Sequence, residues 1–281
     1  MRAMLAVGGV AVLIVLFFLI DAGEDAPTLE VFAGSASKPA LEECARLYES
    51  ENDVTVDLHF SGSGTMLSQM KMTGRGDLYI PGSPDYMEIA VRDGVVEPDT
   101  ISILAYNVPV IAVQKGNPKN ITSLDDLLRD DVRVGIGDPR TVCLGLYSVE
   151  LLEHNGISER MRDRMKVYAE SCSKAASLLA FGSVDAVIGW RVFGAWNPEK
   201  IDIVHVQADR VPRISYIPAA ISTFTRDRTR ARDLLDFLGS DACKRVFREK
   251  DYLSTEAEAR QYAPNAELGG LYDLPAGWSD G

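Results

Sequence analysis

Short extended apolar runs and longer amphipathic stretches alternate along this chain after its first 28 residues. Three extended runs occupy residues 28–34, 54–60 and 77–80, and each is followed by a stretch with apolar side chains every three or four positions. The first pattern is typical of strands and the second of helices packed on a core. Such a series predicts a parallel sheet that is covered by helices on both faces.

Capping residues mark where these helices begin. Ser37 stands before Pro39, and Ser83 stands directly before Pro84. Serine is favoured at the N-cap position, and proline is favoured in the first helical turn, where an N–H would have no partner within the helix. Ser123 has Asp126 three positions on, which is the spacing of a capping box.

A second series of the same kind follows. Its predicted strands and helices alternate at residues 132–136, 144–156, 166–170, 173–183 and 185–190. Two long extended runs, at 102–114 and 213–223, could each leave one sheet and enter another.

The two series predict an α/β protein of two lobes, each a mostly parallel sheet flanked by helices. A ligand cleft is expected between the lobes, where strand ends and helix starts converge. We expect lobe 1 to comprise residues 29–107 plus 219–262, and lobe 2 to comprise residues 108–218. Residues 263–281 are rich in glycine, proline and acids, which predicts a flexible tail.

The first 28 residues predict a membrane anchor or a signal segment. Residues 4–20 are uncharged and apolar for 17 positions, with Arg2 before them and acidic residues after them. A run of 17 is near the lower limit for spanning a bilayer and is longer than a usual signal-peptide core. Since the cleavage site is also poor, an uncleaved anchor is favoured over a cleaved signal. The charge asymmetry places the body outside the cytoplasm.

The charge balance excludes some partners. With 29 Lys and Arg against 41 Asp and Glu, the net charge of −12 argues against nucleic-acid binding, which needs a basic face. An anion would have to be held by local groups and not by the overall field. The three histidines show no metal-ligand spacing, so we expect no metal site.

Four strand-to-helix junctions consist largely of small residues, at 33–37, 61–64, 137–145 and 169–174. The N–H groups of a first helical turn lack partners within the helix, and the helix dipole adds positive charge there. Such junctions bind anions, most easily where glycine and serine expose the backbone. We therefore expect residues 61–64, Ser-Gly-Ser-Gly, to leave amides and hydroxyls free for a ligand. The simpler alternative is that each serine caps a helix and each glycine forms a turn.

These residues carry a resemblance to a known family. The ordered segments "VFAGSASKPALEECARLYE", "FSGSGTM", "GDLYIPGSPDYMEIA", "VGIGDPRTVCLGLYSVELL", "GSVDAVIGWRVFGA" and "DLLDFLGSDACKRVFREKDYLS" resemble the periplasmic molybdate/tungstate-binding proteins of ABC transporters. The similarity runs from about residue 29 to residue 262. The resemblance implies a type II extracellular solute-binding protein, of a divergent branch, with the two-lobed periplasmic-binding-protein fold.

In that family a tetrahedral oxyanion is held between the lobes by hydroxyls, backbone amides and an aromatic hydroxyl, without a metal or cofactor. The implied ligand-binding residues are Ser35, Ala36, Ser37, Ser63, Gly64, Cys143, Leu144, Cys172 and Trp190. Trp190 replaces the usual tyrosine, and Tyr86 and Tyr147 are expected to pack on the sheets. Gly189 stands where a metal-completing branch has an acid, so the resemblance implies non-covalent binding of a tetrahedral anion.

The four cysteines leave alternatives open. Cys44 and Cys243 are expected to be core thiols. The resemblance places Cys143 and Cys172 at helix starts in the cleft, either as a disulfide between two loops or as two thiols at a ligand site. An oxidising compartment favours the disulfide. A thiol at a helix start is expected to have a lowered pKa.

The resemblance implies a function outside the cytoplasm. The protein is expected to be a monomeric, anchored or exported solute-binding protein that passes a molybdate-like or tungstate-like oxyanion to an ABC permease. The alternatives are a membrane-anchored sensing module of the same fold, or a protein that binds another small ligand through its cleft thiols. No catalytic triad or carboxylate pair is placed in the cleft, so we expect no enzyme.

Overall fold

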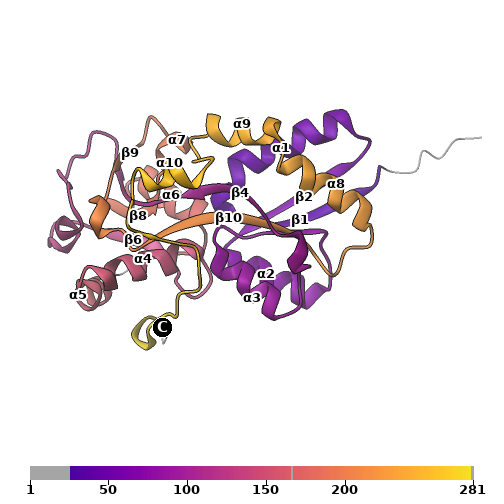
Figure 1. Ribbon diagram of the computed structural model, residues 1–281. Coiled ribbons are helices and arrows are strands. Elements are labelled where there is room, and N and C mark those ends of the chain that lie inside the picture. Colours follow the sequence, from indigo (N-terminus) through magenta and orange to yellow (C-terminus); the bar gives the residue numbers. More distant parts are fainter. Residues whose placement is uncertain (1–25, 166, 280–281) are drawn as a thin grey trace, which may run out of the picture.

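The computed structural model describes residues 26–165 and 167–279, which form two lobes side by side (Figure 1). Each lobe is built around one sheet, and helices flank both sheets. The predicted fold class, an α/β protein of two lobes with helix-flanked sheets, is therefore confirmed. The sheets are mixed, and that of lobe 2 has two parallel and two antiparallel strand pairs.

Lobe 1 is built around a six-stranded sheet with the strand order β11-β10-β3-β1-β2, to which β4 adds by pairing with β10. Its strands are β1 (Thr28–Gly34), β2 (Thr55–Ser61), β3 (Leu78–Ile80), β4 (Ser102–Asn107), β10 (Arg213–Ile221) and β11 (Glu267–Leu268). The helices on this side are α1 (Lys38–Glu51), α2 (Ser63–Thr73), α3 (Pro84–Arg92), α8 (Arg228–Leu238) and α9 (Asp241–Glu249). Strands β1, β2 and β3 are parallel, as the alternating pattern predicts, whereas β10 runs antiparallel to β3.

Lobe 2 is built around a five-stranded sheet with the strand order β7-β6-β8-β5-β9. These strands are β5 (Pro109–Gln114), β6 (Val134–Gly137), β7 (Val167–Ala169), β8 (Ala186–Trp190) and β9 (Ile201–Val204). Its helices are α4 (Cys143–His154), α5 (Ser158–Arg164), α6 (Cys172–Ala180) and α7 (Phe193–Trp196). The short α10 (Glu256–Arg260) and α11 (Ala276–Ser279) follow near the end of the chain.

The chain crosses between the sheets in two places. β4 lies in the first sheet and β5 in the second, with Val108 alone between them. Residues 205–212 make the return from β9 to β10. β4 and β10 pair antiparallel through the middle of the molecule (Figure 1), so they form the wall where the two lobes meet.

The apolar core is continuous across that wall. One buried cluster fills lobe 1 and extends to the inner ends of lobe 2, where it includes Cys143, Cys172 and Trp190. A second cluster fills the rest of lobe 2. The lobes are thus in direct contact, which is the closed arrangement of a two-lobed protein.

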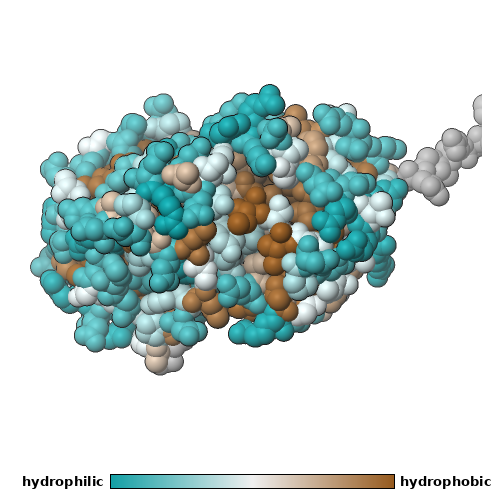
Figure 2. All heavy atoms as spheres, in the orientation of Figure 1, coloured by the Kyte–Doolittle hydropathy of each residue, from teal (hydrophilic) through white to brown (hydrophobic). Residues whose placement is uncertain are grey.

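The outer side of the wall is partly apolar. Apolar atoms gather in the middle of the face in Figure 2, over the region where Figure 1 places β4 and β10. At the start of β4, Ile101 and Ile103 are 41% and 39% exposed. Single exposed apolar side chains are common on protein surfaces, so we assign this region no function.

The C-terminal segment departs from its expected form as a flexible tail. β11 pairs with β10, and Trp278 is 6% exposed with its indole N–H donating to Ser158 Oγ at 2.9 Å. The backbone N–H of Tyr272 donates to Asp85 Oδ1 at 3.0 Å. The segment is therefore packed on the lobes, because its scattered apolar side chains and backbone groups find partners that a composition argument cannot foresee.

The expected membrane anchor lies outside the described residues, apart from its last three positions. Among residues 26–165 and 167–279, no helix has the length and apolar character needed to cross a bilayer.

A buried carboxylate joins the starts of two neighbouring strands of the lobe 2 sheet, β6 and β8. Asp185, which is 7% exposed, accepts hydrogen bonds from Arg133 N, Nε and Nη2 at 2.8 to 3.1 Å. The Arg133 side chain holds the pKa of Asp185 below its usual value, although burial opposes this. A depressed folded-state pKa contributes stability above the unfolded pKa of about 3.9, and this is lost as the pH falls through the folded value.

We therefore expect Asp185→Asn to lower the free energy of unfolding by about 1 to 2 kcal/mol at pH 7, since Arg133 is mostly exposed. Urea unfolding at several pH values measures the difference between variant and parent. The difference should shrink as the pH falls below the unfolded-state pKa of about 3.9. A difference that stays constant with pH would contradict the assignment of the effect to the ionised carboxylate.

Candidate ligand-binding site between the lobes

Five helices begin at the junction between the lobes. From lobe 1 come the turn Ser35–Ser37 leading into α1, the start of α2 at Ser63 and the start of α3 at Pro84. From lobe 2 come the starts of α4 at Cys143 and of α6 at Cys172. Each start directs N–H groups and the positive end of a helix dipole at the junction. Together they form a place suited to a small anion.

Glycines allow these segments to touch. A Cβ on Gly82 would lie 2.7 Å from Cys143 Sγ and 2.9 Å from Ala36 Cβ, so α4 and two loops of lobe 1 meet at this residue. A Cβ on Gly62 would lie 2.7 Å from the carbonyl oxygen of Thr141 in lobe 2. Any larger residue would push the lobes apart.

The serines predicted to bind the ligand are buried, and their hydroxyls form hydrogen bonds within the protein. Ser63 Oγ accepts a hydrogen bond from the backbone N–H of Gly82 at 3.0 Å, and Ser63 is 1% exposed. Ser35 Oγ accepts from the N–H of Ser173 at 3.1 Å, which joins lobe 1 to the start of α6. Ser37 Oγ donates to the carbonyl of Gly34 at 3.0 Å. The structure thus brings both predicted loops to one point and orients their hydroxyls.

Two of the predicted residues use a backbone group for contacts within the protein. The N–H of Gly64 donates to the carbonyl of Thr141 at 2.9 Å, so it joins the lobes and is not free for a ligand as expected. The carbonyl of Ala36 accepts from the hydroxyl of Tyr252 at 2.6 Å. The glycines at residues 61–64 therefore serve the close approach of the lobes.

The cleft cysteines lie together as free thiols. All four cysteines are free and buried, so the disulfide favoured by the compartment argument is not formed between Cys143 and Cys172. The pKa of Cys172 is raised well above its usual value by its hydrogen bond with the Cys143 thiol and by burial. The expected lowering at a helix start is wrong, because these effects outweigh the helix dipole. The N–H of Leu144 also faces the Cys172 sulfur and lowers this pKa slightly.

The other two cysteines form a second pair that sequence reasoning treated separately. The thiols of Cys44 on α1 and Cys243 on α9 are hydrogen-bonded, and both side chains are fully buried. Their pairing and burial raise the pKa of Cys44. The prediction that both are core thiols is confirmed.

We expect four titratable thiols per chain when the protein, purified without reductant, is denatured and treated with a thiol reagent. In the native state the reaction should be slow, because each cysteine is at most 2% exposed and neutral thiols react poorly. Counting thiols in Cys172→Ser, where three are expected, calibrates the assay. A count of two in the parent would show one disulfide and contradict free thiols in both pairs.

Trp190, at the end of β8, completes the lobe 2 side of the site. It is fully buried, and its ring meets the ring of Tyr147 edge to face with centroids 5.1 Å apart. Its indole N–H lies beside the Cys172 thiol and lowers the pKa of that thiol. Within residues 26–165 and 167–279, however, no acceptor meets hydrogen-bond geometry with Trp190 Nε1.

Sequence reasoning did not predict several other buried polar groups that lack a hydrogen-bond partner among the described residues. In the described part of the chain, hydrogen-bond partners are lacking for Ser83 Oγ, both side-chain polar atoms of Asn107 and the Tyr147 hydroxyl. All three side chains are at most 1% exposed. A buried polar group without a partner costs roughly 1 to 3 kcal/mol, so several at one junction indicate a place for a polar ligand. The only sequence signal was Ser83 at a helix start.

A buried ionic cluster stands behind Tyr147. Arg213 Nη1 lies 2.9 Å from Asp85 Oδ1 and Arg213 Nε lies 2.7 Å from Glu150 Oε2, with the guanidinium 4.1 Å from the centre of the Tyr147 ring. Asp85 belongs to α3 in lobe 1 and Glu150 to α4 in lobe 2, so Arg213 links the lobes. Burial raises the pKa of Glu150 even though Arg213 opposes this.

Two arginines beside the cleft, Arg140 and Arg191, form ion pairs with acidic side chains. Arg140 pairs with Asp138 at 2.9 Å, and Arg191 pairs with Asp251 at 2.8 Å. Both arginines therefore have acidic partners at the rim of the junction.

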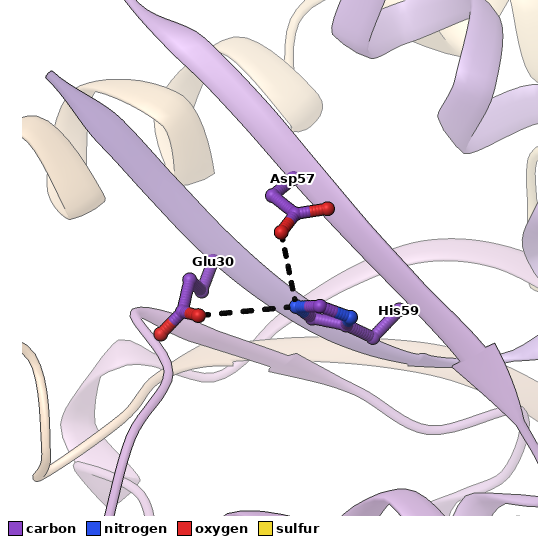
Figure 3. Close-up of side chains that lie close together, drawn as sticks. All are labelled: Glu30, Asp57 and His59. Atoms are coloured by element: carbon purple, nitrogen blue, oxygen red, sulfur yellow. Dashed lines mark ion pairs between the residues drawn. The ribbon is translucent and has the colours of Figure 1, made fainter.

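One group of side chains could hold a metal ion far from the cleft. Glu30 on β1 is paired in register with Asp57 on β2, and His59 follows on the same face, with its Nε2 3.4 Å from Asp57 and 3.9 Å from Glu30 (Figure 3). The ligand atoms all lie within 4.8 Å of one another. Both oxygens of Glu30, however, accept hydrogen bonds from Arg75. We therefore interpret the group as a surface ion-pair network.

Two lobes closed over buried helix starts, with polar groups at the junction that lack partners among the described residues, give the architecture of a protein that encloses a small ligand. The chain belongs to the family of bacterial extracellular solute-binding proteins, which it matches over residues 29–252.

Several relatives are similar over most of their length. YvgL of Bacillus subtilis, a candidate substrate-binding lipoprotein of an ABC transporter, is 27% identical over 78% of this chain and 84% of its own. The molybdate-binding protein ModA of Mycobacterium tuberculosis is 24% identical over 77% of this chain and 85% of its own. The periplasmic molybdate-binding protein of Azotobacter vinelandii has a similar structure, with a TM-score of 0.71 and 16% identity over 81% of this chain and all of that one. Identity this low establishes the fold alone.

Proposed function

We propose that this protein captures a small tetrahedral oxyanion of the molybdate and tungstate kind between its lobes, outside the cytoplasm, and delivers it to an ABC permease. The observation that carries the proposal is the meeting of five helix starts from both lobes at one buried junction, with Trp190 Nε1 unpartnered among the described residues. The similarity to molybdate-binding relatives supports the choice of an oxyanion.

The closed arrangement supports capture by lobe closure. Two hydrogen bonds cross the cleft, from the N–H of Ser173 to Ser35 Oγ and from the N–H of Gly64 to the carbonyl of Thr141. An open form would lack both. A ligand that contacts both lobes binds the closed form more tightly, which shifts the population towards closure. The crossing segments at residue 108 and at residues 205–212 would act as hinges. The protein would be a monomer held at the membrane by its N-terminal segment.

Calorimetric titration of residues 26–281 with molybdate, tungstate, sulfate and phosphate tests the proposal. Saturable binding of at least one of these anions, with a stoichiometry near one, is expected. No binding of any of the four to a folded sample would overturn the proposal.

A further inference from the structure

The wall behind the helix starts carries polar groups that a fully ionised anion cannot satisfy. Asn107, the last residue of β4, lies opposite Ser215 of β10 in the antiparallel pair. Side chains that oppose each other in such a pair share one face. The neighbouring pair, Tyr106 and Tyr216, occupies the other face, where their ring centroids are 6.3 Å apart.

Ser215 fixes which face is the inner one. Its Oγ donates to the carbonyl of Gly82 at 3.4 Å, and Gly82 donates to Ser63 Oγ on its other side. Ser215 also lies beside the hydroxyl of Tyr147 and lowers the pKa of that hydroxyl, against the larger effect of burial. Because Asn107 shares the face of Ser215, it belongs to the wall between Gly82 and the Tyr147–Trp190 pair.

The unpartnered atoms on this wall include an acceptor as well as donors. Trp190 Nε1 can only donate, and the hydroxyls of Ser83 and Tyr147 can do either. Asn107 is different, since its amide carries an acceptor oxygen and a donor nitrogen whichever way it is oriented. In residues 26–165 and 167–279, both of its polar atoms lack a partner. Asp85 Oδ2, two residues after Ser83, is a second buried acceptor without a donor in the same range.

We infer that the ligand carries a hydroxyl proton of its own, which it donates to Asn107, and is thus a protonated oxyanion such as hydrogen phosphate. This inference rests on the proposed capture of a tetrahedral oxyanion between the lobes, and it selects hydrogen phosphate over the molybdate and tungstate named in that proposal. Molybdate and sulfate are fully deprotonated at neutral pH and offer no donor, whereas both phosphate species present at pH 7 carry at least one O–H. A site built to bond a ligand hydroxyl discriminates strongly against an analogue that lacks it, because the buried acceptor stays unpaired.

Competition titrations at pH 7 with inorganic phosphate, sulfate and molybdate test the inference on the parent and on Asn107→Leu. Leucine has the shape of asparagine without its polar atoms. The parent should bind phosphate at least tenfold more tightly than sulfate or molybdate. In N107L the affinity for phosphate should fall about tenfold or more, while the affinities for sulfate and molybdate change less than about threefold. Tyr106→Phe, on the same strand but the other face, is the matched control and should leave all three affinities unchanged.

The outcomes separate the inference from the proposed function. Tighter binding of sulfate or molybdate than of phosphate by the parent would overturn the inference and leave oxyanion capture standing. This comparison needs no variant, so it holds even if N107L does not fold. Preference for phosphate that survives in N107L would overturn the role of Asn107 and show that water supplies its donor. Absence of binding by all three anions, and by tungstate, would overturn both.

Discussion

Replacing Ser63 with leucine is expected to abolish oxyanion binding, with an affinity loss of at least a hundredfold. Ser63 Oγ accepts the backbone N–H of Gly82, and a Cβ on Gly34 would lie only 2.6 Å from that oxygen, so no room exists for a larger side chain. A leucine would leave the Gly82 N–H unpaired and hold the lobes apart. Calorimetric titration with molybdate, tungstate, sulfate and phosphate measures the loss.

Ser68→Leu is the matched control for this experiment. Ser68 lies on the same helix, α2, but it is exposed to solvent. Its replacement should leave both the affinity and the melting temperature nearly unchanged. Ser63→Leu with parental affinity and an intact fold would place the ligand elsewhere and contradict the assignment of Ser63.

The second large effect is expected on stability. Asp85→Ala should lower the free energy of unfolding by about 3 kcal/mol or more, because it removes one partner of a buried ion pair. Asp85 and Arg213 are 0% and 3% exposed, and Asp85 Oδ1 also accepts the backbone N–H of Tyr272. The variant therefore leaves the buried guanidinium with Glu150 as its remaining carboxylate partner and loosens the C-terminal segment. Urea unfolding measures the change.

A double-variant cycle separates the ion pair from simple loss of packing. Arg213→Met combined with Asp85→Ala should recover part of the loss, since the deeply buried guanidinium is then gone and only Glu150, whose side chain is 16% exposed, loses its partner. Glu97→Ala, which removes a partner of the mostly exposed Arg228, is the surface control and should cost less than about 1 kcal/mol. Equal effects of Asp85→Ala and Glu97→Ala would show that burial does not strengthen the Asp85–Arg213 interaction.

These predictions depend on contacts between the lobes, and the ionic cluster illustrates why. Asp85 comes from α3, Glu150 from α4 and Arg213 from the crossing strand β10. Closure brings these three charged side chains together, so it buries charges that water would hydrate in an open form. Their mutual pairing limits this cost and gives the two lobes a defined relative orientation.

Much of the fold could be predicted from the sequence because its signals are local. The alternation of strands and helices, the helix starts at Ser37 and Ser83 and the capping box at Ser123 all depend on residues within a few positions of one another. The same is true of the small-residue junctions, which the structure brings together at Ser35, Ser63, Cys143 and Cys172. Periodicity and capping act within one element, so the chain itself carries them.

The rest was decided by tertiary structure. Asn107 became a candidate ligand contact through the register of β4 against β10, and a one-residue shift would have turned it to the other face. The two thiol pairs, the use of the Gly64 amide between the lobes and the docking of Trp278 likewise depend on segments far apart in the chain. The pattern of apolar and small residues along the chain determined that this protein folds as two α/β lobes with small-residue helix starts. Only packing determined which polar groups would be buried at the junction without a partner. Whether a side chain is buried depends on the residues packed around it in the folded protein, and most of these are distant in the sequence.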